Sequence, residues 1–142
     1  MPRLAPLLSA ALIFALPALA EEEKKATLFK TPWCGCCKGY VQHMRDQGWQ
    51  VETRDLKNLD MVKRIMGVPI EMQSCHTITI GDYVVEGHVP LAYIDKLMTE
   101  KPKIRGIALP GMPTGTPGMP GPREPLTIMT LESPPKVYAT RP

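Results

Sequence analysis

The chain has 142 residues, of which 44% are apolar, 22% are charged and 6% are aromatic, and its formal net charge is +3. This length predicts one domain, and this composition excludes a wholly disordered chain. Basic and acidic residues are interspersed, which excludes nucleic-acid binding through a basic stripe.

Residues 1–20 have the pattern of a cleavable secretory signal peptide. Arg3 supplies the positive start, an almost wholly apolar run extends from residue 4 to residue 16, and Ala18 and Ala20 form a small-x-small cleavage site. The run is too short for a transmembrane helix, so an anchor that is never cleaved is the weaker interpretation. We therefore expect residues 21–142 to be exported, most simply to a bacterial periplasm, with no membrane attachment after cleavage.

The next hundred residues alternate between strand and helix patterns. Apolar spacing predicts strand 26–30, helix 34–47, strand 49–54, helix 56–66, strands 76–80 and 83–86, and a third helix that begins at Pro90. Gly48 and Gly67 end the first two helices, and Gly81 with Asp82 predicts a hairpin turn. The expected fold class is α/β, thioredoxin-like, in the glutaredoxin order β-α-β-α-β-β-α. Four methionines on apolar helix faces are expected in the core: Met44, Met61, Met66 and Met98.

The C-terminal part of the sequence changes in character. Residues 110–125 contain six prolines and four glycines, which excludes a regular element there. Two further short strands are expected at residues 126–131 and 137–140. The predicted organisation is a signal peptide at 1–20, a thioredoxin-like metal-binding domain at 21–100, and a Pro/Gly/Met-rich loop and extension at 101–142 that packs on the domain.

Three cysteines, Cys34, Cys36 and Cys37, cluster at the predicted turn from the first strand to the first helix. They are too close in sequence to join distant loops, and a bridge among them would stabilise the fold little. The start of a helix and Lys38 both stabilise thiolates, which favours disulfide exchange and metal binding alike. Exchange needs only Cys34 and Cys37, so the additional Cys36 favours a metal site.

The fourth cysteine, Cys75, precedes the predicted third strand, and the glutaredoxin order would bring it beside the other three. A buried structural cysteine is the alternative. Thiolates suit Cu(I) and Zn(II). Four Cu(I) ions cancel the charge of four thiolates, and adjacent cysteines are suited to bridging several ions. A copper cluster bridged by the cysteines is therefore the more specific hypothesis, and a structural zinc site is the alternative.

The remaining candidate ligands are histidines and methionines. His88 is predicted as a ligand because it starts the third helix near the same face. Ligand roles for His76, His43, Met112 and Met119 stay open, since each also fits a packing role. Trp33, immediately before the cluster, is expected to shield it from water.

Several ordered motifs together resemble the CopG family of exported, thioredoxin-like copper-resistance proteins. They are TPWCGCC at residues 31–37, GVP at 67–69, SCHT at 74–77, VEGHVP at 85–90 and PGMP at 110–113. The resemblance covers roughly residues 26–120. It implies a multi-copper cluster bridged by four cysteines and a redox role that interconverts Cu(I) and Cu(II); the cysteines are Cys34, Cys36, Cys37 and Cys75.

The resulting prediction is a periplasmic copper-binding protein of copper resistance. Its predicted metal ligands are Cys34, Cys36, Cys37, Cys75 and His88, and its partners are copper ions and other periplasmic copper-handling or redox proteins. Turnover as a copper oxidoreductase and simple sequestration both stay open. Two alternatives are a periplasmic thiol-disulfide oxidoreductase and a single-ion copper chaperone.

Overall fold

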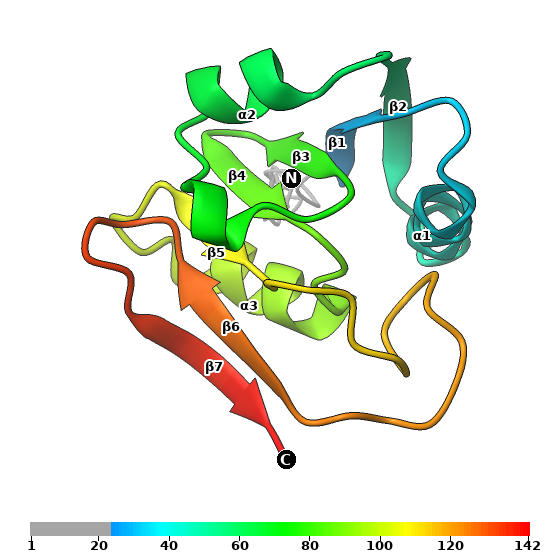
Figure 1. Ribbon diagram of the computed structural model, residues 1–142. Helices are drawn as coiled ribbons and strands as arrows, with labels where there is room; N and C mark the ends of the chain where they lie inside the picture. The colour runs from blue at the N-terminus through cyan, green and yellow to red at the C-terminus, as the bar shows by residue number, and fades with distance from the viewer. Residues whose placement is uncertain (1–23) are drawn as a thin grey trace, which may run out of the picture.

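The computed structural model describes residues 24–142 and forms a mixed α/β fold around one sheet (Figure 1). The predicted signal peptide lies outside the described residues. The strands are β1 (Lys25–Lys30), β2 (Gln50–Asp55), β3 (Thr77–Ile80), β4 (Tyr83–Glu86), β5 (Gly106–Ala108), β6 (Leu126–Thr130) and β7 (Val137–Arg141). The helices are α1 (Gly35–Asp46), α2 (Asp60–Ile65), the 3-10 helix η1 (Ile70–Met72) and α3 (Leu91–Glu100).

The seven strands lie in the order β2-β1-β3-β4-β5-β6-β7. The pairs β1–β2 and β4–β5 are parallel, and the other neighbouring pairs are antiparallel. No helix in the described part of the chain has the length and apolar character needed to cross a membrane.

Both faces of the sheet are covered, and strand alternation assigns side chains to each. Val85 and Ile107 belong to the larger core, with buried side chains of α1 and α3. Their neighbours Val84 and Ala108 point to the opposite face and join a smaller cluster that includes Met72 of η1. Successive side chains of a strand point to opposite faces of the sheet. One face is therefore covered by α1 and α3, and the other by α2 and η1 (Figure 1).

The second helix differs most from its prediction. Apolar spacing predicts one helix over residues 56–66, but α2 spans only Asp60–Ile65 and is followed by η1. Met61 is 71% exposed and Ile65 is 78% exposed, so the expectation that Met61 lies in the core is wrong. Leu59 and Lys63 are buried instead, because the helix turns a different face to the sheet than its apolar residues indicate. The short strand β5, which carries only three residues, is absent from the prediction.

Strand register brings four chain segments to one edge of the sheet. Near the end of β1, Phe29 pairs with Thr77 at the start of β3. Thr77 pairs in turn with Glu86, the last residue of β4, and Glu86 pairs with Ala108, the last residue of β5. The segments that leave β1, β4 and β5 and the segment that enters β3 therefore meet. These segments carry every cysteine of the chain.

Candidate metal centre

The first helix begins in the middle of the cysteine cluster. Cys34 is the N-cap of α1, and its Sγ accepts a hydrogen bond from the backbone N–H of Cys37 at 3.3 Å. The sulfur takes the place that a side-chain oxygen of Ser, Thr, Asp or Asn usually fills at a helix start, where the first N–H groups have no partner within the helix. Cys34 and Cys37 are joined by a disulfide, with Cα atoms 5.3 Å apart. Cys37 is buried, whereas Cys34 is partly exposed.

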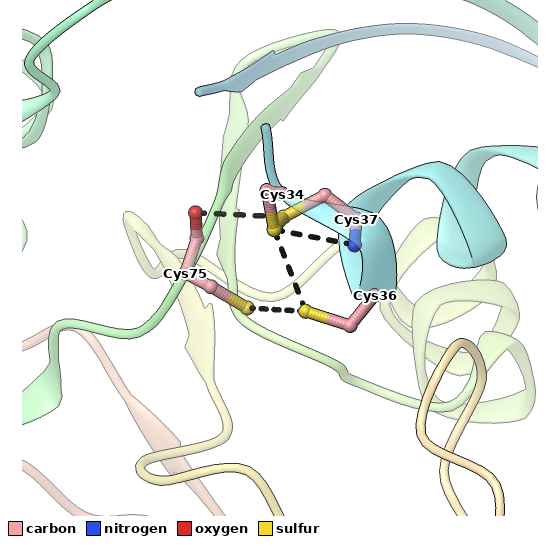
Figure 2. Close-up of side chains that lie close together, drawn as sticks. All are labelled: Cys34, Cys36, Cys37 and Cys75. Carbon is pink, nitrogen blue, oxygen red and sulfur yellow. Dashed lines mark hydrogen bonds between the residues drawn. A yellow bond between two sulfur atoms is a disulfide. The ribbon is translucent and has the colours of Figure 1, made fainter. Parts of the chain in front are cut away.

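The two free thiols lie beside this disulfide. Cys36 Sγ is 3.4 Å from Cys34 Sγ and 3.7 Å from Cys75 Sγ (Figure 2). Cys75 thus lies next to the other three cysteines, as expected from its position before the third strand. All four sulfur atoms fall within 4.8 Å of one another. Burial, followed by the electrostatic interaction and the hydrogen bond with Cys36, raises the pKa of Cys75 to about 12. Cys75 is therefore a protonated thiol unless a cation displaces its proton.

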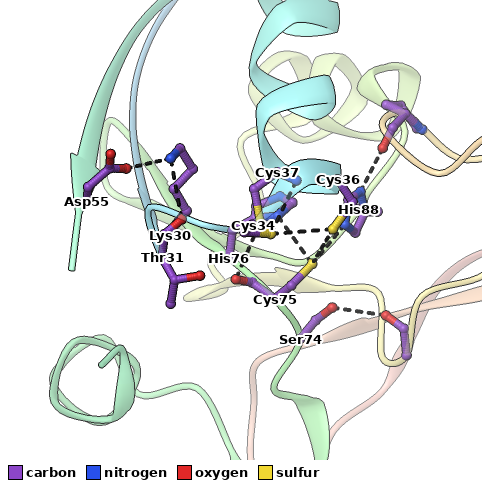
Figure 3. The surroundings of a disulfide bond; sticks show 12 residues. Lys30, Thr31, Cys34, Cys36, Cys37, Asp55, Ser74, Cys75, His76 and His88 are labelled. Atoms are coloured by element: carbon purple, nitrogen blue, oxygen red, sulfur yellow. Dashed lines mark hydrogen bonds and ion pairs between the residues drawn. A yellow bond between two sulfur atoms is a disulfide. The ribbon is translucent and has the colours of Figure 1, made fainter. Parts of the chain in front are cut away.

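His88 reaches the cluster from the segment after β4. It is fully buried, and its Nε2 is 2.8 Å from Cys75 Sγ (Figure 3). Its Nδ1 lies 2.7 Å from the carbonyl oxygen of Pro117, which accepts a hydrogen bond and so fixes the proton on Nδ1. Nε2 then carries the free lone pair toward the sulfur. Burial lowers the pKa of His88, which keeps this imidazole neutral and able to bind a metal.

His76 also lies in the cluster, although neighbours on a strand point to opposite faces. It precedes β3, outside the regular strand, and its Nδ1 is 3.7 Å from Cys75 Sγ. Its ring packs against Tyr40 and His88, with centroids 4.6 and 4.7 Å away. Burial, followed by electrostatic interactions with His88 and with the Lys63 ammonium group, lowers the pKa of His76 well below its usual value. Cys75, His76 and His88 offer donor atoms within 4.8 Å of one another.

Comparison with solved structures identifies the relatives of this arrangement. A structure titled "Copper resistance protein copG- Form 1" matches with a TM-score of 0.78 at 36% identity, over 85% of this chain and 99% of the other. A second, "Copper resistance protein copG- Form 2", matches with a TM-score of 0.77 at 36% identity, over 83% of this chain and 98% of the other. The chain belongs to the CopG family. Residues 72–119 also match a family model described as a protein of unknown function, DUF411. No curated protein matches significantly.

The segment matched by the DUF411 family model includes the loop that covers the cluster. Gly118 has a φ of +79°, and a Cβ there would lie 2.3 Å from the Cys36 carbonyl oxygen and 2.8 Å from the Tyr40 nitrogen. The loop backbone therefore packs directly on α1, which only glycine permits. Ser74 Oγ donates to the carbonyl oxygen of Gly111 at 2.9 Å, which fixes the start of the same loop beside Cys75.

Other expected participants are not placed at the cluster. Trp33 is 69% exposed, so the expectation that it shields the cluster from water is wrong. His43, partly exposed on α1, belongs to neither of the potential metal-binding groups found among residues 24–142. Met112 is 53% exposed, and Met119 is partly buried and bridges to Thr116.

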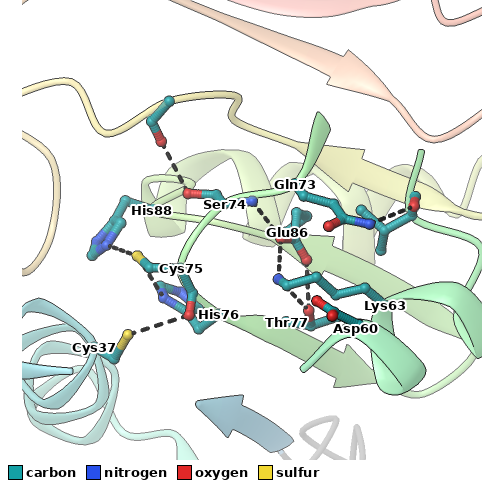
Figure 4. A network of polar contacts seen from close by, with 12 residues as sticks. Cys37, Asp60, Lys63, Gln73, Ser74, Cys75, His76, Thr77, Glu86 and His88 are labelled. Carbon is teal, nitrogen blue, oxygen red and sulfur yellow. Dashed lines mark hydrogen bonds and ion pairs between the residues drawn. The ribbon is translucent and has the colours of Figure 1, made fainter. Parts of the chain in front are cut away.

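A buried ion pair behind the cluster escaped the sequence analysis. Lys63 Nζ on α2 donates to Glu86 Oε1 at 2.5 Å, and both side chains are almost fully buried. Glu86 also accepts from the backbone N–H of Ser74 at 2.7 Å and from Thr77 Oγ1 at 2.6 Å (Figure 4). Burial raises the pKa of Glu86, and the Lys63 charge opposes that rise. The pair therefore fixes the backbone of Ser74, the residue before Cys75. In the sequence, the only sign of this role is a charged residue, Glu86, at the end of a strand rich in valine.

Proposed function

We propose that this protein is an exported copper-binding protein of copper resistance that holds several Cu(I) ions bridged by cysteine sulfur. The ligands in this proposal are Cys34, Cys36, Cys37, Cys75 and His88. The observation that carries it is the convergence of four sulfur atoms within 4.8 Å, supplied by three residues at a helix start and one from a distant segment. Family membership supports copper as the ion, since both structural relatives are titled copper resistance proteins.

The sulfur separations support thiolates that share metal ions. Two thiolates on one tetrahedral ion lie about 3.8 Å apart when each metal–sulfur bond is about 2.3 Å. Cys36 Sγ lies 3.7 Å from Cys75 Sγ and 3.4 Å from Cys34 Sγ, which is close to that spacing. Thiolates are soft donors that favour Cu(I). Four Cu(I) ions would also leave the buried thiolates without net charge, which a single Zn(II) ion would not.

The same cysteines can supply electrons. When Cys34 and Cys37 are both thiols, their oxidation by two Cu(II) ions gives the disulfide, two Cu(I) ions and two protons. The disulfide joining these residues shows that their positions accommodate the oxidised product. Reduction of Cu(II) at this pair would consume two of the four thiols that the Cu(I) cluster uses. Redox interconversion and Cu(I) storage would thus alternate at one site, with storage resuming when an external thiol reduces the disulfide.

We infer further that the fold is thioredoxin-like. The order β1-α1-β2-α2-β3-β4-α3 and the strand arrangement β2-β1-β3-β4 support this assignment, with the reactive turn after β1. Residues 101–142 would then be an extension that adds three strands and the covering loop. The signal-like residues 1–20 support export to the periplasm.

The Cys34–Cys37 disulfide also favours a second candidate, a periplasmic thiol-disulfide oxidoreductase. Cys34 is partly exposed and Cys37 is buried, so an incoming thiolate would attack Cys34 and displace Cys37. This function does not need Cys36. A single-ion copper chaperone is the third candidate, and it differs from the first in stoichiometry.

Titration with Cu(I) separates these functions. Fully reduced protein under argon, titrated against a competing chelator, is expected to bind three or four ions per chain cooperatively. One ion would favour a chaperone. In Cys36→Ser, copper binding should collapse while disulfide exchange at Cys34 and Cys37 persists. Undiminished copper binding in this variant, or none in the wild type, would contradict the proposal.

A further inference from the structure

The disulfide changes which donor atoms remain at the cluster. With Cys34 and Cys37 joined, the free donors are the thiols of Cys36 and Cys75 and the imidazoles nearby. Cys75 belongs to both groups of potential ligands, the four-sulfur group and the group with His76 and His88. The oxidised protein therefore keeps two thiols and two imidazoles as donors, whereas the reduced protein offers all four sulfur atoms.

The environment of His76 is unusual for a core histidine. The side chain is completely buried, and its Nε2 has no hydrogen-bond partner. Buried polar atoms are rarely left unpaired, because the loss of hydration is not repaid. The side-chain polar contact that His76 does make is with Cys75 Sγ, at 3.7 Å from Nδ1. The ring thus lies beside the shared sulfur, with a backbone contact to Gly87 and with one ring nitrogen that has no hydrogen-bond partner.

The separations fit two donors on one ion. With metal–sulfur bonds of about 2.3 Å and metal–nitrogen bonds of about 2.0 Å, a sulfur and a nitrogen lie about 3.5–3.7 Å apart and two sulfurs about 3.8–4.0 Å apart in tetrahedral or trigonal sites. The distances from Cys75 Sγ to His76 Nδ1 and to Cys36 Sγ are both 3.7 Å. His88 Nε2, at 2.8 Å from the same sulfur, makes a hydrogen-bond contact that would open when an ion replaces the thiol proton.

We propose that the disulfide form binds one divalent ion of borderline softness through Cys36, Cys75, His76 and His88. Two imidazoles with two thiolates suit Cu(II) and Zn(II), whereas four thiolates suit Cu(I). Oxidation of the Cys34–Cys37 pair thus changes the preferred cargo from several Cu(I) ions to one divalent ion. The proposal deepens the proposed function and rests on it for copper as the ion in the cell.

The test uses Co(II) as a probe, because it does not oxidise thiols and its absorption reports coordination geometry. Protein carrying the Cys34–Cys37 disulfide, verified by mass spectrometry, is titrated with Co(II) under argon. We expect one ion per chain, a thiolate charge-transfer band and the intense visible bands of a tetrahedral site. The Cys34→Ser/Cys37→Ser protein should behave in the same way. Competition with Zn(II) then ranks these two divalent ions.

Histidine variants identify the ligands. His76→Gln and His88→Gln should each weaken Co(II) binding at least tenfold, whereas His43→Gln, altered on the exposed side of α1, should bind as the wild type does. If His76→Gln does not fold, proton NMR of the wild-type disulfide form with one Co(II) counts the coordinated imidazoles by their hyperfine-shifted exchangeable N–H signals. Two are expected, and one alone would overturn the assignment of His76.

Failure here is distinguishable from failure of the proposed function. Absence of divalent binding in the disulfide form, or undiminished binding in folded His76→Gln, overturns this proposal. The Cu(I) stoichiometry of the reduced wild type is measured in parallel. If that remains three or four, the copper-cluster proposal stands while the mixed-donor site is rejected.

Discussion

At the scale of single residues, the cluster combines groups that burial holds in their neutral forms. Burial raises the pKa of Cys75 to about 12 and lowers the pKa of His76 and His88. Neutral imidazoles are ready to bind a metal, but the thiol must first lose its proton. Metal binding is therefore expected to release protons and to weaken as the pH falls. The Pro117 carbonyl fixes the proton of His88 on Nδ1, so that the lone pair of Nε2 faces the cluster.

The lowered histidine pKa values predict how stability depends on pH. In the unfolded chain His76 accepts a proton near pH 6.5, whereas the folded protein keeps it neutral to lower pH. The unfolded state then binds more protons, so the free energy of unfolding should fall as the pH drops below about 6.5. Urea denaturation of the metal-free disulfide form between about pH 7 and pH 5 measures this fall. In His76→Gln it should be shallower.

His43→Gln is the matched control, since it removes a histidine that is partly exposed and outside the cluster. Its stability should follow the wild-type pH dependence. Parallel curves for the wild type and His76→Gln would show that burial of His76 does not shift its proton affinity.

At the scale of elements, α2 and β4 position Cys75 through the backbone of the preceding residue, Ser74. Glu86 Oε1 accepts from the Ser74 backbone N–H, and Lys63 from α2 balances the buried carboxylate. A buried ion pair seldom stabilises a fold more than apolar residues of the same volume would. Its value here is geometric, because the carboxylate fixes the backbone one residue before a candidate ligand.

Two double variants test this positioning role. Lys63→Met/Glu86→Leu removes both charges and the acceptor for Ser74, whereas Lys63→Met/Glu86→Gln removes both charges but keeps an acceptor oxygen. Neither leaves a buried unpaired charge, so we expect both to fold with similar melting temperatures. Cu(I) affinity, measured by chelator competition, should fall about 10–100-fold in the Leu variant and remain near wild type in the Gln variant. Equal affinities in the two variants would contradict the positioning role.

The same elements show what sequence can and cannot predict. The turn from β1 to α1 was predictable, because Pro32, the cysteines and Gly48 mark the boundaries locally. The orientation of α2 was not, because Met61 and Ile65 fit an apolar face yet are exposed, while Lys63 is buried by a partner 23 residues away. The contact between Cys75 and His88 likewise depends on register between strands. Residue propensity and apolar spacing predict structure from neighbours in the sequence. The Lys63–Glu86 and Cys75–His88 contacts join residues far apart in the sequence, so these signals do not predict them.

At the scale of the whole molecule, the cluster exists where segments from four strands meet and one loop closes over them. The loop is fixed at three points: Gly111 by Ser74, Pro117 by His88, and Gly118 by direct packing on α1. The covering loop therefore contacts both the helix that carries three cysteines and the segment that carries the fourth. Its placement should govern how fast bound ions leave.

Two glycines of this loop offer a matched pair of variants. Gly118 and Gly111 have similar positive φ values, +79° and +75°, so alanine imposes comparable backbone strain of about 1–2 kcal/mol at either position. A Cβ at Gly111 meets nothing within 4 Å, whereas one at Gly118 would collide with backbone atoms of Cys36 and Tyr40. Gly118→Ala should therefore lift the loop from α1 and detach the Pro117 carbonyl from His88. We expect it to lose about 1–3 kcal/mol more stability than Gly111→Ala. Transfer of Cu(I) to a chelator should be faster in Gly118→Ala alone, and limited proteolysis should cut its loop sooner. Equal transfer rates in the two variants would show that the loop covers the cluster without controlling release.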